Sequence, residues 1–318
     1  MDDPRSVFLD SIELSKLEIQ EFSGFIFFCG GPISDVSEPN PVSARDQIYR
    51  YIWAHRGELA ERIRRAEDIQ DWFRPSVGYK DLITFENHIA ELADAVVIFV
   101  ESPGAIAEVG AFSQIPSITK KLLVFVQERH ADDESFINLG PLDFLRDKDD
   151  KSVGIYPWVQ KFDQEDFTYD PSRLNGCESE IADNIERHIG QLNTFESFKS
   201  DSTRHSMLLL CDLMEMFSAL TITELNSYVD RLGLGLTKIQ LKGSLYILQK
   251  FDYASIYHRG HNDYYATVRR PCNIAYNMKK GVDRVRRKDA ILDYYESEEP
   301  VRFKAIKSIR SEMAGAAK

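Results

Sequence analysis

Two carboxylates stand seven positions apart in the segment Glu101-Ser102-Pro103-Gly104-Ala105-Ile106-Ala107-Glu108. The apolar run 95–100 predicts a buried strand that ends at Glu101, and residues 104–114 favour a short helix. Glu108 then lies on the first turns of that helix, where N–H groups and the helix dipole keep a carboxylate ionised. Such a carboxylate can attack an anomeric carbon, or stabilise the cation formed when an N-glycosidic bond breaks. The alternative for Glu108 is a salt-bridged surface residue.

A second strand end carries small residues. The apolar run 24–29 is stopped by Gly30-Gly31-Pro32, where glycines would let backbone N–H groups approach a ligand closely, although a tight turn alone also explains them. Ligands of parallel α/β sheets bind beyond the carboxyl ends of the strands, so both strand ends are expected at one site. The segment is neither a P-loop nor a GxGxxG loop. The expected substrate-binding residues here are Cys29, Gly30, Gly31, Ser102 and Gly104.

Alternating strands and helices must position these residues. Between the two strands, residues 44–66 predict a helix, Ile69–Phe73 a strand and residues 81–93 a helix. Further strands are expected at 122–126 and 153–158, which together predict an α/β domain over residues 1–165 with a parallel sheet covered on both faces. Residues 166–204 are polar and predict a helical linker, with a helix near 178–192.

The pattern after the linker is mostly helical. Thr221 and Glu224 form a capping box for a helix that ends before Gly233, and Thr237 begins a second helix to about Phe251. Two strands, Ala254–Tyr257 and Tyr264–Val268, are expected to be joined by a turn at residues 260–263. Helix, turn, helix and hairpin is the order of a winged helix-turn-helix, expected over residues 205–318. Many small domains of this kind bind only protein.

Charge divides the chain unevenly. The 318 residues carry a net charge of −12, but residues 269–318 hold 13 Lys and Arg against 7 Asp and Glu, a net of +6. The basic tail would permit local contact with nucleic acid, and a solvated helix face is the alternative. The expected contacts to nucleic acid or a partner are Arg284, Arg286, Arg287 and Lys288. We expect no membrane span, no signal peptide, no zinc site and no disulfide framework, and therefore a cytoplasmic protein.

Residues 27–32, Phe-Phe-Cys-Gly-Gly-Pro, resemble the strand and loop that open the nucleoside deoxyribosyltransferases, which read Leu-Ala-Gly-Pro. Residues 104–110 resemble their Gly-Thr/Ser-x-x-Glu-x-Gly motif, whose Glu is the nucleophile and matches Glu108. The acidic residue at the strand end matches Glu101, and that of the preceding helix matches Glu86. These two are commonly Asp in the family, where they contact the sugar hydroxyls and the base. The resemblance implies a Rossmann-like catalytic domain with Glu108, Glu101 and Glu86 as its catalytic residues.

Three ordered motifs are similar to those of the deoxyribosyltransferase-like effector toxins of bacterial retrons. They are Phe-x-Cys-Gly-Gly at 27–31, Glu-Ser-Pro-Gly-x-x-x-Glu-x-Gly-Ala-Phe-Ser at 101–113 and Ser-Phe-Ile-Asn-x-Gly-Pro at 135–141. The resemblance implies an anti-phage toxin–antitoxin system acting by abortive infection. Its toxin would cleave the N-glycosidic bond of a nucleotide, with NAD as the expected substrate. The retron reverse transcriptase and its multicopy single-stranded DNA, with the attached RNA, would hold the toxin inactive until phage disturbs the complex.

Asn138 follows the fourth expected strand. Deoxyribosyltransferases complete their pocket with an Asn from a neighbouring subunit, so the resemblance implies a substrate-binding role for Asn138 in a homo-oligomer or larger assembly. A turn residue before Gly140-Pro141 is the alternative.

Three functions remain open from the sequence. The first is an N-glycosidase that needs only water, no metal and no cofactor. The second is a deoxyribosyltransferase that needs an acceptor base. The third is a DNA-binding regulator that senses a nucleotide without consuming it.

Overall fold

The chain forms two compact units, each built from separated segments. The sheet unit contains residues 24–70 and 89–192, and the helical unit contains residues 1–23, 71–88 and 193–318. The computed structural model describes residues 3–20, 22–35, 37–73, 78–131, 133–162, 167–192, 195–269, 273–277 and 283–316.

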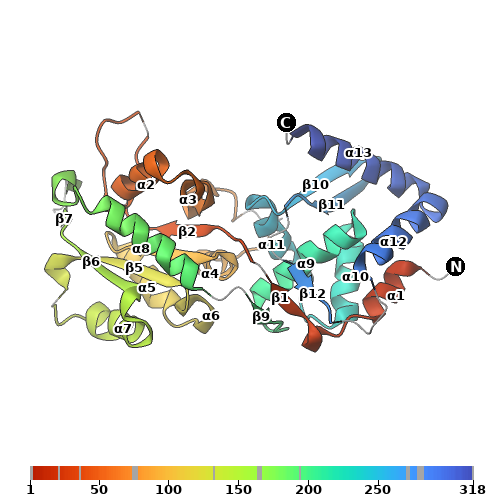
Figure 1. Cartoon of the computed structure of the whole chain (residues 1–318), viewed down its shortest axis with the longest axis horizontal. Coiled ribbons are helices and arrows are strands. Elements are labelled where there is room, and N and C mark those ends of the chain that lie inside the picture. The colour runs from red at the N-terminus through yellow and green to blue at the C-terminus, as the bar shows by residue number, and fades with distance from the viewer. Residues whose placement is uncertain are drawn as a thin grey trace. The chain divides into compact units, whose positions relative to one another are not determined.

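A parallel sheet of order β3-β2-β4-β5-β6 forms the centre of the sheet unit (Figure 1). Its strands are β2 (Ile26–Cys29), β3 (Ile63–Arg64), β4 (Ala95–Phe99), β5 (Leu122–Gln127) and β6 (Val153–Tyr156). Every residue of β2, β4 and β5 is buried, as expected for parallel strands covered on both faces. The expected parallel α/β architecture is confirmed. Because β2 pairs with β4, with Cys29 opposite Ile98, the carboxyl ends of these strands meet at one edge.

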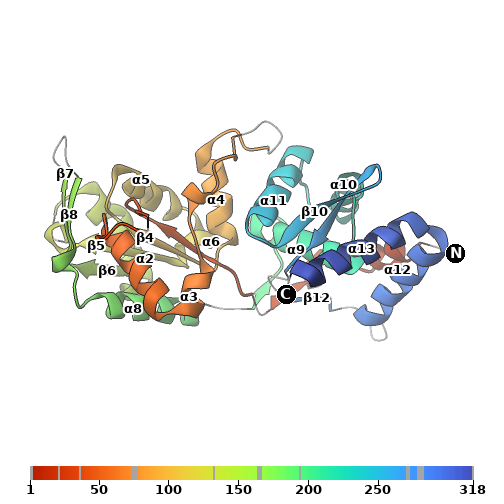
Figure 2. The same cartoon turned by 90° about the horizontal axis from the view of Figure 1, so that it is seen from above.

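Helices lie on both faces of this sheet (Figure 2). On one face, Phe28, Phe99 and Phe125 share a core with Ile48 and Ile181, which belong to α2 and α8. On the other face, the ring of Phe27 lies 6.3 Å from that of Phe112 on α5. The helices and remaining strands of the unit are α2 (Ala44–His55), α3 (Gly57–Arg62), α5 (Pro103–Phe112), α6 (Pro116–Thr119), α7 (Asp143–Lys148), α8 (Glu178–Gln191), β7 (Val159–Phe162) and β8 (Phe167–Asp170).

The second strand differs from the sequence prediction. The helix expected over 44–66 is broken at Arg56, whose φ of −137° and ψ of 66° are not helical. The chain enters β3 at Ile63, which pairs with Ile26, whereas Ile69–Phe73 forms no strand. Ile63 had fitted the helical apolar spacing equally well, because a short apolar segment suits either structure.

The helical unit contains the two helices that the sequence predicted before the hairpin, α10 and α11. A capping box closes the start of α10, since Thr221 and Glu224 bond each other's backbone N–H groups, and Gly233 with φ of 68° ends the helix. A three-stranded antiparallel sheet of order β12-β1-β9 joins the beginning of the chain to this unit. The elements are α1 (Pro4–Asp10), β1 (Glu18–Gln20), β9 (Glu196–Ser197), α9 (Thr203–Phe217), α10 (Ile222–Leu232), α11 (Lys238–Lys250), β12 (Asn273–Ala275), α12 (Arg284–Glu298) and α13 (Pro300–Ala316).

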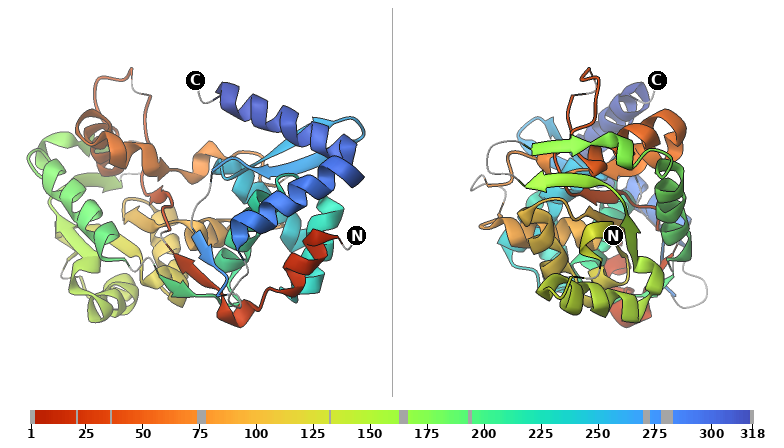
Figure 3. Two further views of the ribbon diagram at one scale, coloured as in Figure 1. Left: turned by 45° about the vertical axis from the view of Figure 1, so that its right-hand side comes forward. Right: turned by 90° about the vertical axis from the view of Figure 1, so that its left-hand side faces the viewer.

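A hairpin of β10 (Ala254–Arg259) and β11 (Asn262–Thr267) follows α11. Its turn is shorter than expected, because Arg259 pairs with Asn262 and only Gly260 and His261 lie between them. Gly260 has a φ of 62°, which such a tight turn requires. The helix α13 runs beside the hairpin (Figure 3), where Arg259 bonds Ser308 at 3.1 Å and also pairs with Glu312. One strand of the hairpin is therefore held by a later helix.

The compact units do not follow the expected boundaries 1–165, 166–204 and 205–318. Residues 1–23 join the helical unit because β1 pairs with β9 and β12. Residues 71–88 also join it, so α4 (Leu82–Leu92) crosses from one unit into the other. In the expected linker, α8 lies within the sheet unit.

The sequence predicts neither a disulfide framework nor a membrane span. Cys29, Cys177 and Cys211 are free thiols. Within the described ranges, no helix combines the length and the apolar character needed to cross a bilayer.

Candidate active site

Glu101 directly follows β4 and is completely buried. Its Oε1 accepts hydrogen bonds from the backbone N–H groups of Gly31 at 3.3 Å and Arg45 at 2.9 Å, and its Oε2 accepts one from Ala44 at 2.7 Å. Burial raises the pKa of Glu101 to about 7, against the opposing effect of these donors and of the Arg45 guanidinium. Both oxygens thus hold the loop after β2 and the first turn of α2. This geometry favours a positioning role for Glu101, and its contact with a sugar stays a prediction.

Glu108 lies on α5, which starts where the sequence predicted. Ser102 caps the helix by accepting the N–H of Ala105 at 3.1 Å, and Pro103 occupies its first position. Oε2 of Glu108 is buried and has no hydrogen-bond partner among the described residues. Burial raises the pKa of Glu108, while the nearby Arg45 guanidinium and a hydrogen bond with Cys29 lower it. The structure therefore brings Glu108 beside Cys29, as expected.

Arg45 is a component of this site that the sequence analysis missed. It is 3% exposed, and its guanidinium donates to the carbonyl groups of Gly31, at 3.0 Å, and Phe28. It also pairs with Glu67 at 2.8 Å, and its charge acts on both Glu101 and Glu108. An Arg in the first turn of a helix usually lies in solvent, so only the fold identifies it.

The glycines after β2 are required by close packing. Gly30 has a φ of 142°, and a Cβ there would lie 2.8 Å from the carbonyl oxygen of Phe99. A Cβ on Gly31 would lie 2.8 Å from that of Ser43. Because the N–H of Gly31 bonds Glu101, it is not directed at a ligand. The chain bends at both glycines, and substrate contact by either of them stays a prediction.

The side chain of Asn138 is hydrogen-bonded to the backbone of the loop that precedes it. Its side-chain N–H₂ group donates to the carbonyl oxygens of His130, Ala131 and Asp133 at 2.8–3.0 Å, and the residue is 4% exposed. This geometry favours the turn role that the sequence left as the alternative. Gly104 has an ordinary backbone conformation, and a Cβ there would come no closer than 3.7 Å to Ser102 Oγ. Substrate contacts by Asn138, Ser102 and Gly104 stay predictions.

Glu86 lies on α4, in the part of that helix that belongs to the helical unit. Phe85 beside it is fully buried, and its ring stacks on Trp72 at 5.7 Å. The role of Glu86 in catalysis stays a prediction. The sequence had placed this segment within the catalytic domain, because nothing local to it indicates which core it joins.

The four basic residues expected to bind a partner lie on α12 and divide into two pairs. Arg284 bonds Asp212 at 2.7 Å and Glu215 at 3.0 Å, and Lys288 bonds Glu215 at 2.5 Å. Arg286 has an 87% exposed side chain and only a long ion pair, at 3.7 Å, with Asp283. Arg284 and Lys288 thus fix α12 to α9, whereas Arg286 and its neighbour Arg287 remain candidates for a partner contact.

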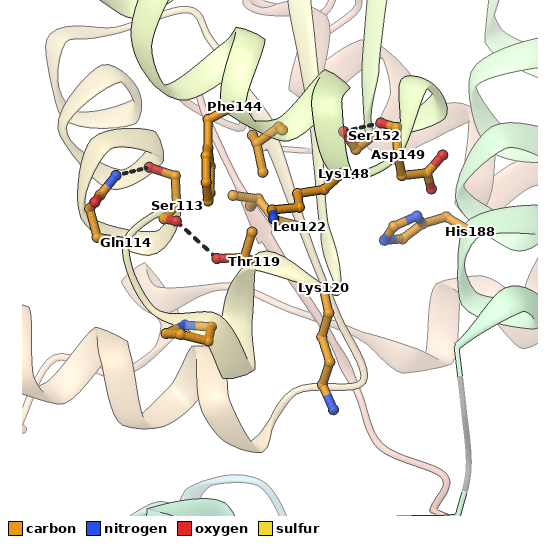
Figure 4. A pocket seen from close by; sticks show the side chains of 12 residues that line it. Ser113, Gln114, Thr119, Lys120, Leu122, Phe144, Lys148, Asp149, Ser152 and His188 are labelled. Carbon is orange, nitrogen blue, oxygen red and sulfur yellow. Dashed lines mark hydrogen bonds between the residues drawn. The ribbon is translucent and has the colours of Figure 1, made fainter.

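A separate cavity of about 460 Å³ lies in the sheet unit (Figure 4). Its lining includes Leu122 at the start of β5 and Ser152 just before β6, so it lies at the amino ends of the strands. Glu101 and Cys29 lie at the carboxyl ends. Figure 4 shows the rings of His188 and Phe144 directed into this cavity. None of the residues predicted from the sequence lines it, and no motif in the sequence indicated it.

Known proteins similar to this chain are retron proteins. One, from Escherichia coli, is named as a candidate ribosyltransferase/DNA-binding protein of retron Ec86; it is 34% identical over 128 residues, 40% of this chain and 39% of its own length. Another, similarly named for retron Ec73 of Escherichia coli, is 23% identical over 233 residues, 66% of this chain and 69% of its own length. A model of the STM3845 retron effector protein family matches residues 41–255. That match covers more than half of the chain and spans both units, so the protein belongs to the STM3845 retron effector family.

Proposed function

We propose that the sheet unit is an N-glycosidase that hydrolyses the bond between base and sugar of a nucleotide, with NAD as the expected substrate. The observation that carries the proposal is Glu108 Oε2, a buried carboxylate oxygen beside the carboxyl ends of β2 and β4 that has no hydrogen-bond partner in the described part of the chain. Leaving such an atom buried costs free energy, which a functional role explains. The names of the two retron relatives, which include ribosyltransferase, support glycosyl transfer as the reaction class.

In the proposed reaction, the bond between the sugar C1′ and the base nitrogen breaks, and the base leaves with both bonding electrons. Glu108 either forms a bond to C1′ or stabilises the cation there. A water then attacks C1′ and loses a proton to solvent; where Glu108 had bonded to C1′, that bond breaks and the carboxylate leaves with both electrons. The nicotinamide of NAD is already cationic, so it leaves without being protonated. Arg45 favours the ionised form of Glu108, and Glu101 holds the first turn of α2, which carries Arg45.

Product analysis tests this proposal. The purified chain is incubated with NAD, ATP or deoxynucleosides, and the released base is measured by chromatography. Release in buffer alone supports hydrolysis. Release only when an acceptor base is added would show sugar transfer in place of hydrolysis. If nucleotide is bound but never consumed, the protein is a nucleotide sensor and not an enzyme acting on these substrates.

The acid side of the pH profile provides a further prediction. Burial raises the pKa of Glu108 above its ordinary value of 4.5, and the reaction needs the carboxylate. Activity is therefore expected to fall as the pH decreases, with a midpoint above 4.5. The profile of kcat/KM against pH measures this midpoint. A profile that stays flat down to pH 4.5 contradicts an essential ionised Glu108.

DNA binding is a second candidate function, proposed for the helical unit. It is supported by the order of α10, α11 and the hairpin along the chain, which is the order of elements in winged helices, and by the names of the relatives. We propose that this unit attaches the toxin to the retron reverse transcriptase and its DNA, which hold it inactive. Assembly into a homo-oligomer or a larger complex is part of this proposal.

Charge reversal tests whether the basic residues of α12 have two different roles, one in stabilising the fold and one in binding a partner. Arg286→Glu and Arg287→Glu are expected to weaken association with the reverse transcriptase–DNA complex. For Arg286→Glu, the free energy of unfolding should stay within about 0.5 kcal/mol of the wild type, because this side chain is exposed and its ion pair with Asp283 is long, at 3.7 Å. Arg284→Glu is the contrasting variant, since it would place a carboxylate against Asp212 and Glu215 and destabilise the fold. Pull-down with and without nuclease, alongside urea unfolding, measures both effects. Unchanged association in the first two variants would exclude the contact.

A further inference from the structure

The exposed side of α11 is basic. The helix carries Lys238, Lys242 and Lys250 and no Asp or Glu. Lys238 and Lys242 line a hollow of about 240 Å³ together with Thr223 and Asn226 of α10. Among the residues that the structure describes, no carboxylate lines this hollow. Cations with neighbouring hydroxyl and amide groups suit a phosphate chain, because phosphates are bound by lysines and by polar hydrogen-bond donors.

Residues 71–88 of the same unit already pack against part of the surface of α11. A Cβ on Gly78 would lie 2.7 Å from the carbonyl oxygen of Ile239, and a Cβ on Gly243 would lie 3.2 Å from the ring of Tyr79. The segment and the helix are thus in direct backbone contact, which glycine permits at both positions. The approach is too close for another chain to pass between them.

An acidic residue of the segment bonds the basic side of the helix. Asp71 Oδ1 lies 2.8 Å from the Nζ atom of Lys250 and accepts a hydrogen bond from Tyr246 Oη at 2.5 Å. These are the two kinds of group that would hold a phosphate oxygen. A polyanion arriving at α11 would therefore compete with Asp71 for Lys250.

The same segment carries Glu86. Phe85, the residue before it, is fully buried and lies 6.3 Å from the ring of Tyr246 on α11. Tyr79 bonds His88 Nδ1 through its hydroxyl at 2.8 Å, which ties the segment to α4. The position of α4 thus depends on how the segment packs against α11.

We propose that α11 is a docking surface for a nucleic-acid strand, and that the strand and the segment 71–88 compete for it. When the strand is bound, Asp71 is displaced from Lys250, the contact of Tyr79 with Gly243 opens and the amino-terminal half of α4 is released. The consequence for catalysis rests on the proposed function and on the catalytic role that the sequence predicts for Glu86, whose displacement would then lower nucleotide cleavage. The docking itself does not depend on that function.

Hydrogen exchange on the full chain tests the competition, with a single-stranded DNA of about 20 nucleotides as the probe. Binding should slow exchange in α11 and speed it several-fold at residues 78–88. Binding that leaves α11 unprotected overturns the docking surface. Protection of both α11 and residues 78–88 overturns the competition, because the strand and the segment would then be bound together.

Charge-reversed variants identify the surface. Lys238→Glu with Lys242→Glu should weaken DNA binding by about tenfold or more and reduce the log–log salt slope by about 0.7 for each lysine. Lys199→Glu, an exposed lysine of the same unit, is the matched control and should change neither. Equal effects of the control and the α11 variant would assign the binding to general charge.

Tyr79→Ala tests the link from the opposite direction. Loss of this ring should expose the surface of α11 that Tyr79 covers and speed hydrogen exchange at residues 80–88 in the absence of DNA. DNA binding should tighten by about threefold, because a larger fraction of the protein is then competent to bind. Unchanged or weaker binding would contradict competition. The exchange and binding measurements need no catalysis, so they stand even if no base is released. Conversely, base release that is unaffected by bound DNA would remove only the consequence for activity.

Discussion

Replacing Glu108 by glutamine is expected to lower base release by about 10⁴-fold, as for other residues that act directly on the reacting centre. Glutamine keeps the shape of the side chain and removes the negative charge that would attack or stabilise C1′. Release of nicotinamide from NAD under single-turnover conditions measures the effect on the chemical step. Toxicity on expression in a host that lacks the retron provides a second readout.

The fold should survive this change. Because Glu108 Oε2 is buried and no described residue forms a hydrogen bond with it, removing the charge is expected to leave the free energy of unfolding equal or slightly higher. Glu67→Gln is the matched control, since Glu67 pairs with the same Arg45 but is half exposed, and it should lower base release by less than about tenfold. Wild-type activity in Glu108→Gln, or equal losses in the two variants, would contradict the assignment.

The second large effect is expected at Glu101, through stability. In Glu101→Ala, the N–H groups of Gly31, Ala44 and Arg45 would lose their acceptor inside the protein. The expected cost is about 3 kcal/mol or more, since each buried donor left without a partner costs about 1–3 kcal/mol. Urea unfolding at pH 7 measures it. Glu61→Ala, an exposed residue of α3, should change stability by less than about 0.5 kcal/mol.

The pH dependence of this stabilisation has a definite sign. Burial raises the pKa of Glu101 to about 7, above the ordinary value of 4.5, so the folded protein holds this proton more tightly than the unfolded chain does. The contribution that this proton makes to the free energy of unfolding is therefore present in full below pH 4.5 and is lost as the pH rises towards 7 and above. In Glu101→Gln this part of the pH dependence should vanish, and its persistence would assign it to another group.

The sequence predicted the centre of the sheet unit well, for a physical reason. β2, β4 and β5 are buried on both faces, so each is a continuous apolar run with a clear end. The residue after β4 and the capping residues of α10 and α11 follow local rules, and they were found where expected. Glu108 and Cys29 also come together as expected.

The features that could not be predicted from the sequence depend on contacts between distant segments. β1 pairs Glu18 with Ala275, and no local pattern indicates a partner so far along the chain. Arg45 has the sequence context of a surface residue, yet the loop after β2 folds over it. Asn138, Arg284 and Lys288 were chosen by residue type, and the groups that engage their side chains are visible only in the folded chain.

The interleaving of the two units has a consequence for synthesis. The chain passes from one unit to the other at residues 23/24, 70/71, 88/89 and 192/193. On a ribosome, the amino-terminal segment and the segment bearing Glu86 emerge long before α11 and β12, the partners against which they pack. A nascent chain that already contains Glu108 therefore still lacks the support for Glu86. If Glu86 is needed for cleavage, the growing polypeptide stays harmless until its later residues have been translated.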